Sequence, residues 1–99
     1  MTTLAFWHGW GISPDVFTPF ITELKKDVPD NIHFKAMTLP GYDGMPLPSG
    51  NPCEIWVDAM MKNITGPVIL CGWSMGAILA MSAALRYPDR IDRLILFGA

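Results

Sequence analysis

Short runs of apolar residues recur along the chain and predict four β-strands. Residues 3–7, 67–71 and 93–97 are mostly apolar, which is typical of strands buried on both faces. Residues 31–38 instead alternate between apolar and polar side chains, so we expect a strand with one less buried face, near the edge of a sheet. The side chains expected on its buried face are Ile32, Phe34 and Ala36.

The segments between these runs carry the signals of three helices. The first is expected to start with Thr18 as its N-cap and Pro19 at its first helical position, where a proline loses no hydrogen bond. The second is expected to start at Asn51 and Pro52, and the third to cover residues 75–87. The side chains expected to face the core are Phe20, Ile21, Leu24 and Val28 in the first helix, and Ile55, Ala59, Met60 and Ile64 in the second.

The alternation of strands and helices predicts an α/β fold: one domain with a parallel sheet, helices on both faces and right-handed crossovers. If the second strand lies outside the first and the third lies inside it, the strand order is 2-1-3-4. Gly-rich turns at residues 9–11 and 72–76 then follow the carboxyl ends of two neighbouring strands. We therefore expect the two turns to meet over one crevice.

Charge and composition exclude several kinds of function. Seven basic and nine acidic residues give a net charge of −2, and no basic run is longer than Lys25-Lys26, so no nucleic-acid partner is expected. No apolar stretch approaches a membrane span of about 20 residues, and no secretory signal is visible, which predicts a cytoplasmic protein without a membrane partner. Cys53 and Cys71 suit two reduced thiols and lack the spacing of a metal site.

The motif Gly-x-Ser-x-Gly stands between the third apolar run and the third helix, as Gly72-Trp73-Ser74-Met75-Gly76. A sharp turn from strand to helix forces the serine into a strained backbone conformation, and it needs small residues two positions to either side. The helix beyond the turn directs free backbone N–H groups toward whatever the serine attacks. The flanking strand and helix favour this nucleophile turn over a chance match to the motif.

A serine at a helix N-terminus beside a second Gly-rich loop has the arrangement that acyl transfer needs. Ser74 would attack a carbonyl carbon, and the backbone N–H groups of Met75 and Trp10 would hold the oxyanion. Trp10 and Trp73 would form apolar walls for the substrate, although ordinary packing at the end of the sheet accounts for either tryptophan equally well.

Three motifs together resemble the N-terminal half of an α/β-hydrolase: His-Gly-Trp-Gly at residues 8–11, Leu-Pro-Gly at 39–41 and the serine motif. The first and last resemble, more narrowly, the pimeloyl-[acyl-carrier protein] methyl ester esterases of biotin synthesis. The resemblance implies Ser74 as the nucleophile, the amides of Trp10 and Met75 as the oxyanion hole, and no cofactor. It also implies a carboxylic ester substrate, with an ester carried on acyl carrier protein as one candidate.

The same resemblance indicates what is missing. In that family a catalytic acid and then a histidine follow the serine, on loops after later strands, with a cap domain between them. Here the chain ends at Ala99, directly after the fourth predicted strand, and both histidines precede the serine. We therefore expect residues 1–99 to be the N-terminal portion of a hydrolase core, truncated before the last strands and the cap. The open sheet edge is expected to be covered by the missing half or by self-association.

Alternatives remain open at this stage. The same fold could hydrolyse thioesters or support other serine chemistry, or it could be a non-catalytic binding module. His8 ends the strand beside the serine strand and is a weaker candidate for the missing base. Arg86, Arg90 and Arg93 are a possible docking patch for an acidic carrier protein. Thr38 stands where the family usually has an aspartate, so the shape of the loop after it is open.

Overall fold

The computed structural model describes residues 2–9, 13–39 and 52–98. In this part of the chain, strands and helices alternate in the predicted order, with one additional 3₁₀ helix, η1. The elements are β1 (Thr2–Trp7), η1 (Pro14–Phe17), α1 (Thr18–Leu24), β2 (Ile32–Met37), α2 (Pro52–Met61), β3 (Val68–Trp73), α3 (Met75–Arg86) and β4 (Ile91–Phe97).

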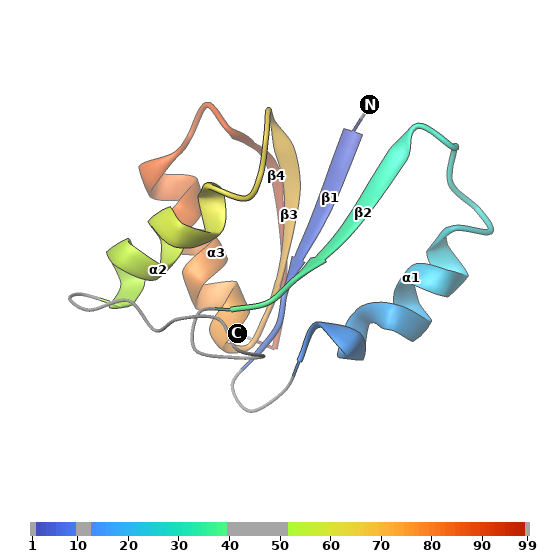
Figure 1. Cartoon of the computed structure of the whole chain (residues 1–99), viewed down its shortest axis with the longest axis horizontal. Helices are drawn as coiled ribbons and strands as arrows, with labels where there is room; N and C mark the ends of the chain where they lie inside the picture. Colours follow the sequence, from blue (N-terminus) through green and yellow to red (C-terminus); the bar gives the residue numbers. More distant parts are fainter. Residues whose placement is uncertain (1, 10–12, 40–51, 99) are drawn as a thin grey trace.

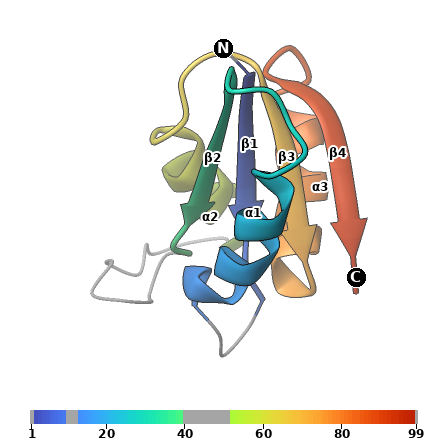
Figure 2. The same cartoon turned by 90° about the vertical axis from the view of Figure 1, so that its right-hand side faces the viewer.

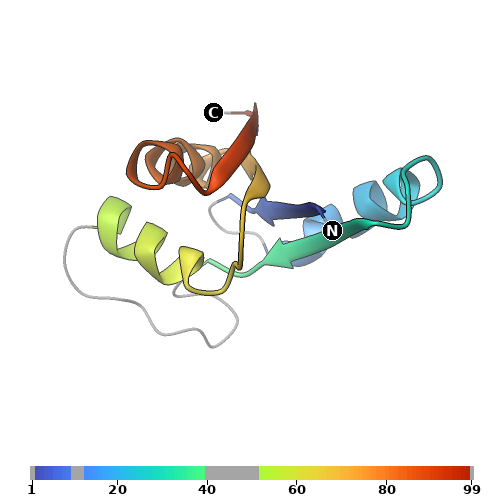
Figure 3. The same cartoon turned by 90° about the horizontal axis from the view of Figure 1, so that it is seen from above.

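The strands form one parallel sheet in the order β2-β1-β3-β4, which confirms the predicted topology. α1 covers one face of the sheet, and α2 and α3 cover the other (Figures 1 and 3). β2 and β4 are the two edge strands, with the central pair between them (Figure 2). The chain changes direction across the sheet between β1 and β3, and in such folds ligands bind beyond the carboxyl ends of the strands at this point.

The register brings the carboxyl ends of the strands to one level. Trp7 at the end of β1 pairs with Met37 of β2 and with Gly72 of β3, and Gly72 pairs with Leu96 of β4. The turn after β3 therefore lies directly beside the end of β1 and the end of β4.

The larger hydrophobic core lies between the sheet and the helices α2 and α3. Trp7 and Leu70 are fully buried at its centre, and the Trp7 Nε1–H points at the Met37 sulfur, 3.3 Å away. Met37 was expected on the less buried face of its strand, but it is only 5% exposed, whereas Ala36 is exposed. The expectation was wrong because the end of β2 is covered from the α2 and α3 side, a packing that alternation within one strand does not reveal.

The opposite face of the sheet has a smaller, aromatic core. The Phe6 ring packs against Phe17 and Phe34, with ring centroids 5.0 and 6.5 Å away. Cys71 is buried in the same cluster, and burial raises the pKa of its thiol to about 11. The thiol is therefore protonated at neutral pH and has little of the thiolate character that reactive cysteines need.

The first helical segment differs from its prediction. Thr18 has helical angles and is the first residue of α1 rather than its N-cap, because η1 already starts a turn earlier, where the Ser13 hydroxyl accepts the Asp15 N–H. Phe17 is buried, whereas Phe20, which was expected to face the core, is half exposed and has its ring edge-on to Phe6 at 6.0 Å. Ile21 and Leu24 pack against the aromatic core, as predicted. Val28 lies beyond the end of the helix, which stops at Leu24.

α2 begins at Pro52, as predicted, while its expected cap Asn51 lies outside the described residues. The buried side chains in and after this helix are Val57, Met60, Met61 and Ile64. Ile55 and Ala59, which were expected to face inward, are only half buried. β4 begins at Ile91, two residues before the predicted position.

Candidate active site

The turn between β3 and α3 holds Ser74 in a strained conformation. Its φ of 58° and ψ of −119° make it the only non-glycine residue with a positive φ in the described part of the chain. Such backbone angles cost about 1 to 3 kcal/mol and occur mainly where the surrounding structure enforces them. The side chain is exposed and makes no capping hydrogen bond to the helix, so its hydroxyl is presented to solvent at the helix N-terminus.

Two glycines make the turn sterically possible. A Cβ atom on Gly76 would lie 2.2 Å from the Trp7 carbonyl oxygen and 2.6 Å from that of His8. A Cβ atom on Gly72 would lie 2.6 Å from the Cα of Ala77. All of these neighbours are backbone atoms, so α3 can approach the end of β1 this closely only without a side chain at position 76, and can fold back onto the end of β3 only without one at position 72.

The end of β4 fixes the turn from its other side. The Ser74 N–H donates to the Phe97 carbonyl oxygen at 3.1 Å. Gly98, with a φ of 63°, passes so close to the Trp73 indole that a Cβ atom there would be 2.9 Å from the ring. This contact was not predicted, because it joins residues far apart in sequence. The only feature of the sequence that indicates this contact is Gly98, which directly follows the last apolar run.

Met75 is the first residue of α3, as predicted. The N–H groups of a first helical turn have no acceptor within the helix, and the helix dipole makes this end partly positive. These groups can therefore donate to an oxyanion that forms next to Ser74. Trp10, the other predicted oxyanion donor, lies outside the described residues.

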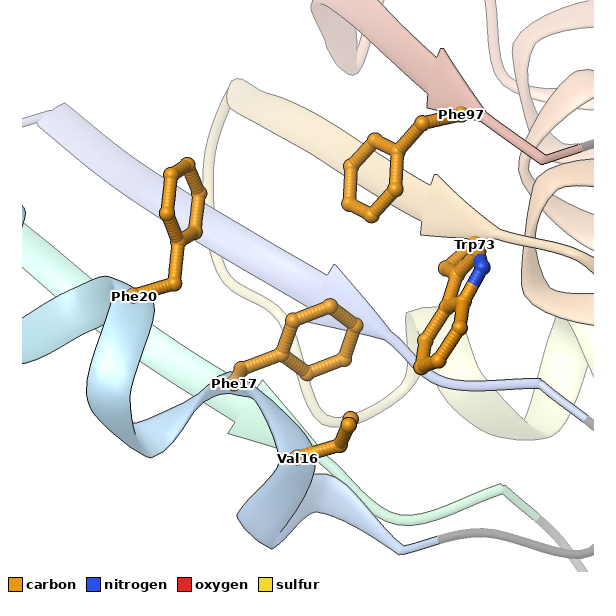
Figure 4. Close-up of a pocket in the computed structure, with 5 residues that line it drawn as sticks. All are labelled: Val16, Phe17, Phe20, Trp73 and Phe97. Atoms are coloured by element: carbon orange, nitrogen blue, oxygen red, sulfur yellow. The ribbon is translucent and has the colours of Figure 1, made fainter.

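Trp73, predicted to form a wall of the site, contributes to an apolar pocket on the α1 face of the sheet. The pocket has a volume of about 430 Å³ (Figure 4). Its lining residues are Val16, Phe17, Phe20, Trp73 and Phe97. Trp73 also packs against the aromatic core, so it has a structural role whether or not it touches a ligand.

His8 lies beside the turn but is not placed to act as a base. The ring is fully buried, and its Nε2 accepts the backbone N–H of Leu39 at 3.0 Å. In that tautomer the Nδ1–H donates to the Gly9 carbonyl oxygen at 2.9 Å. The lone pair that would take a proton from Ser74 is therefore already used to join the loops that follow β1 and β2.

His33 is even less suited to this role. It pairs with Thr3 near the start of β2, at the level of Val68 on β3, which is six residues before Ser74. At about 3.3 Å per residue of strand, it lies roughly 20 Å from the turn, at the opposite end of the sheet.

The arginines near the end of α3 are engaged within the fold. Arg86 forms a two-pronged contact with Asp58 of α2, with Nη2 2.9 Å from Oδ2, and Arg90 donates to the carbonyl oxygens of Ile64 and Gly66. A hydrogen bond from the Tyr87 hydroxyl and the Arg86 guanidinium together lower the pKa of Asp58. This group joins α2 to α3 and leaves fewer free charges for the docking patch considered above.

The lowered pKa of Asp58 predicts a pH-dependent contribution to stability. The contribution is fully present above the unfolded pKa of about 3.9 and is lost as the pH falls through the lower folded value. We expect Asp58→Asn to lower the urea midpoint slightly at pH 7, and the difference from the original chain to vanish in strong acid. Urea unfolding at a series of pH values checks this, with the exposed Asp27→Asn as control. A difference that persists unchanged in acid would contradict it.

Within the described ranges, no group of three or more metal-ligating side chains is present. No described helix is long and apolar enough to cross a membrane.

A sequence model of the alpha/beta hydrolase family matches residues 4–99, which include the turn at Ser74 and both of its glycines. The chain belongs to this family. Solved hydrolases confirm the fold: a marine microorganism esterase superposes with a TM-score of 0.83 at 23% identity, covering 96% of this chain and 36% of its own. An epoxide hydrolase from Bacillus megaterium superposes with a TM-score of 0.82 at 24% identity, covering 98% and 35%.

Two similar curated relatives have the same name. The pimeloyl-[acyl-carrier protein] methyl ester esterase of Aromatoleum aromaticum is 34% identical over 95 residues, which is 96% of this chain and 36% of the relative. The enzyme of the same name from Shewanella sp. is 37% identical over 96 residues, 97% of this chain and 34% of the relative. The chain thus spans about a third of the length of the esterases it matches.

Proposed function

We propose that this chain supplies the nucleophile and part of the oxyanion hole of a serine carboxylesterase. The observation that carries the proposal is the strained, solvent-exposed conformation of Ser74 at the N-terminus of α3. Strain of this kind is retained at functional sites, and here it places a hydroxyl within reach of helix N–H donors.

The reaction then follows from the turn. The Ser74 oxygen attacks the ester carbonyl carbon and transfers its proton to a base, which gives a tetrahedral intermediate. The Met75 N–H, with that of Trp10, holds the negative oxygen, and each such donor is typically worth about 3 to 4 kcal/mol in the transition state. The alcohol leaves with the proton from the base. Water then attacks the acyl-serine, releases the carboxylic acid and restores the hydroxyl.

The base and its acidic partner come, in this proposal, from outside the described residues. The His8 ring already forms hydrogen bonds with the Leu39 N–H and the Gly9 carbonyl oxygen. His33 lies at the end of the sheet opposite to Ser74. We infer that the chain is the N-terminal portion of a hydrolase core, consistent with its coverage of a third of its relatives. The names of those relatives support a methyl ester carried on acyl carrier protein as the substrate.

A non-catalytic binding module is the second candidate, and it is favoured by the engagement of His8 within the fold. A covalent probe separates the two. We expect a fluorophosphonate to label Ser74 weakly or not at all in the chain alone, because an unassisted serine hydroxyl stays protonated. Labelling should rise when the C-terminal part of the Aromatoleum aromaticum esterase is added as a separate polypeptide. Intact-mass spectrometry measures the adduct, with Ser74→Ala as control. Labelling that persists in Ser74→Ala would overturn the assignment of Ser74 as the nucleophile.

A further inference from the structure

The two peptide groups on either side of Ser74 are held by different elements. The N–H of Ser74 donates to the Phe97 carbonyl oxygen of β4 at 3.1 Å. The carbonyl oxygen of Ser74 accepts the N–H groups of Ala77 and Ile78 in α3, at 2.9 and 3.3 Å. The φ and ψ of a residue describe how its two flanking peptide groups are turned relative to each other. The strained angles of Ser74 are therefore set from two sides, by α3 and by the end of β4.

The end of β4 is anchored on the α1 face of the sheet. Phe97 pairs with Trp73 in the sheet register, and the Phe97 ring meets the Phe17 ring edge-on, with centroids 6.4 Å apart (Figure 4). Phe17 is only 3% exposed, and the Trp73 indole packs against the aromatic core that contains it. The carbonyl group that holds Ser74 therefore belongs to a residue that is fixed by its own side chain.

Gly98 lets the chain leave β4 directly beside the Trp73 indole. Its φ is 63°, a conformation that residues with a side chain rarely adopt. A Cβ atom there would lie 2.9 Å from both Cδ1 and Nε1 of Trp73. Because the indole already packs against the aromatic core, a side chain at position 98 would displace either the indole or the end of β4, and both adjoin Ser74.

We propose that the end of β4 and the Trp73 indole position Ser74 for its reaction. We call Phe97, Gly98 and Trp73 the β4 clamp. The clamp keeps the strained angles that hold the Ser74 oxygen at the N-terminus of α3, beside the free N–H groups of the first helical turn. Trp73 then acts on the serine through the backbone, which is a different role from that of a substrate wall. Only the attack of the positioned oxygen on an ester rests on the proposed function.

A thiol at position 74 reports its position without any ester. A helix N-terminus lowers the pKa of a thiol, and the rate of alkylation by iodoacetamide at a series of pH values follows the thiolate. In the Ser74→Cys chain, we expect Gly98→Ala to slow alkylation at pH 7 at least threefold and to raise the pH of half-maximal rate. Peptide mass spectrometry separates position 74 from Cys53 and Cys71. An unchanged rate would overturn the β4 clamp.

The control for backbone strain alone is Gly66→Ala. Gly66 also has a positive φ, but a Cβ atom there would meet nothing within 4 Å, so the alkylation rate should stay the same. Circular dichroism checks that each variant folds.

Two further comparisons separate positioning from general destabilisation. Trp73→Val removes both indole atoms that a Cβ atom at position 98 would meet, so Gly98→Ala should have little further effect in that background. Additive effects would overturn the clamp. Phe97→Ala should slow alkylation as Gly98→Ala does, whereas Leu96→Ala, whose side chain lies on the opposite face of β4, should not.

The original chain offers a test that needs no variant. The Ser74 N–H should exchange with deuterium within tenfold of the rate of the Leu70 N–H in the centre of β3. Exchange at the rate of an unprotected amide would overturn the clamp, because the bond to Phe97 would then not hold the turn. If these results held while the complemented protein hydrolysed no ester, the proposed function would be refuted and the clamp supported.

Discussion

Gly76→Ala is expected to unfold the chain or leave only a small folded fraction. The added methyl group would lie 2.2 Å from the Trp7 carbonyl oxygen, against the backbone at the carboxyl end of the central strand β1. Overpacking of this kind typically costs about 1 to 3 kcal/mol, and more where the neighbour is backbone that cannot move aside. A domain of this size has about 5 to 15 kcal/mol of stability in total.

The matched control is Gly66→Ala. Gly66 has a positive φ of 70°, unlike the helical Gly76, and a Cβ atom there would meet nothing within 4 Å. Its substitution should therefore cost only the backbone strain of about 1 to 2 kcal/mol. Urea unfolding followed by circular dichroism compares the two. Equal midpoints for both variants would mean that the close contact between α3 and the end of β1 is not needed for folding.

Ester turnover is expected to be negligible in the chain alone and to appear when the C-terminal part of the Aromatoleum aromaticum esterase is supplied. The oxyanion hole and substrate binding alone account for roughly 10³- to 10⁴-fold over water, and without a base the serine adds little to this. In the complemented protein, Ser74→Ala should lower kcat by roughly 10³- to 10⁶-fold. Release of p-nitrophenol from p-nitrophenyl butyrate measures the rate, and a matched thioester tests the alternative chemistry.

One result would require a different mechanism. If the chain alone hydrolysed the ester quickly, and His8→Ala abolished this while circular dichroism showed an intact fold, His8 would be the base. Its ring would then have to release the Leu39 N–H during the reaction, because the hydrogen bond now occupies Nε2.

The features of this structure that are determined by the order of neighbouring sequence segments were predictable. The strained turn follows from an apolar run that ends in Gly72 and is followed by a helix. The strand order follows from the alternation of strands and helices together with the topology of parallel sheets.

The predicted buried faces of α1 and β2 were right for Ile21, Leu24 and Phe34, which pack against the aromatic core. They missed Phe17 and Met37, because the burial of these two side chains depends on the early turn of η1 and on the α2 side of the sheet. The hydrogen bond from the Ser74 N–H to the Phe97 carbonyl oxygen joins two segments that are far apart in the sequence, so no pattern within either segment predicts it.

The backbone angles at Ser74 have a consequence for how this sequence can drift. Glycine tolerates a positive φ without the steric penalty of a side chain, so at this one position the most stable residue and the reactive residue are different. A lineage released from any need for the hydroxyl would gain stability by a single change to glycine. Under the proposed function, Ser74 is therefore kept for its chemistry at the expense of stability.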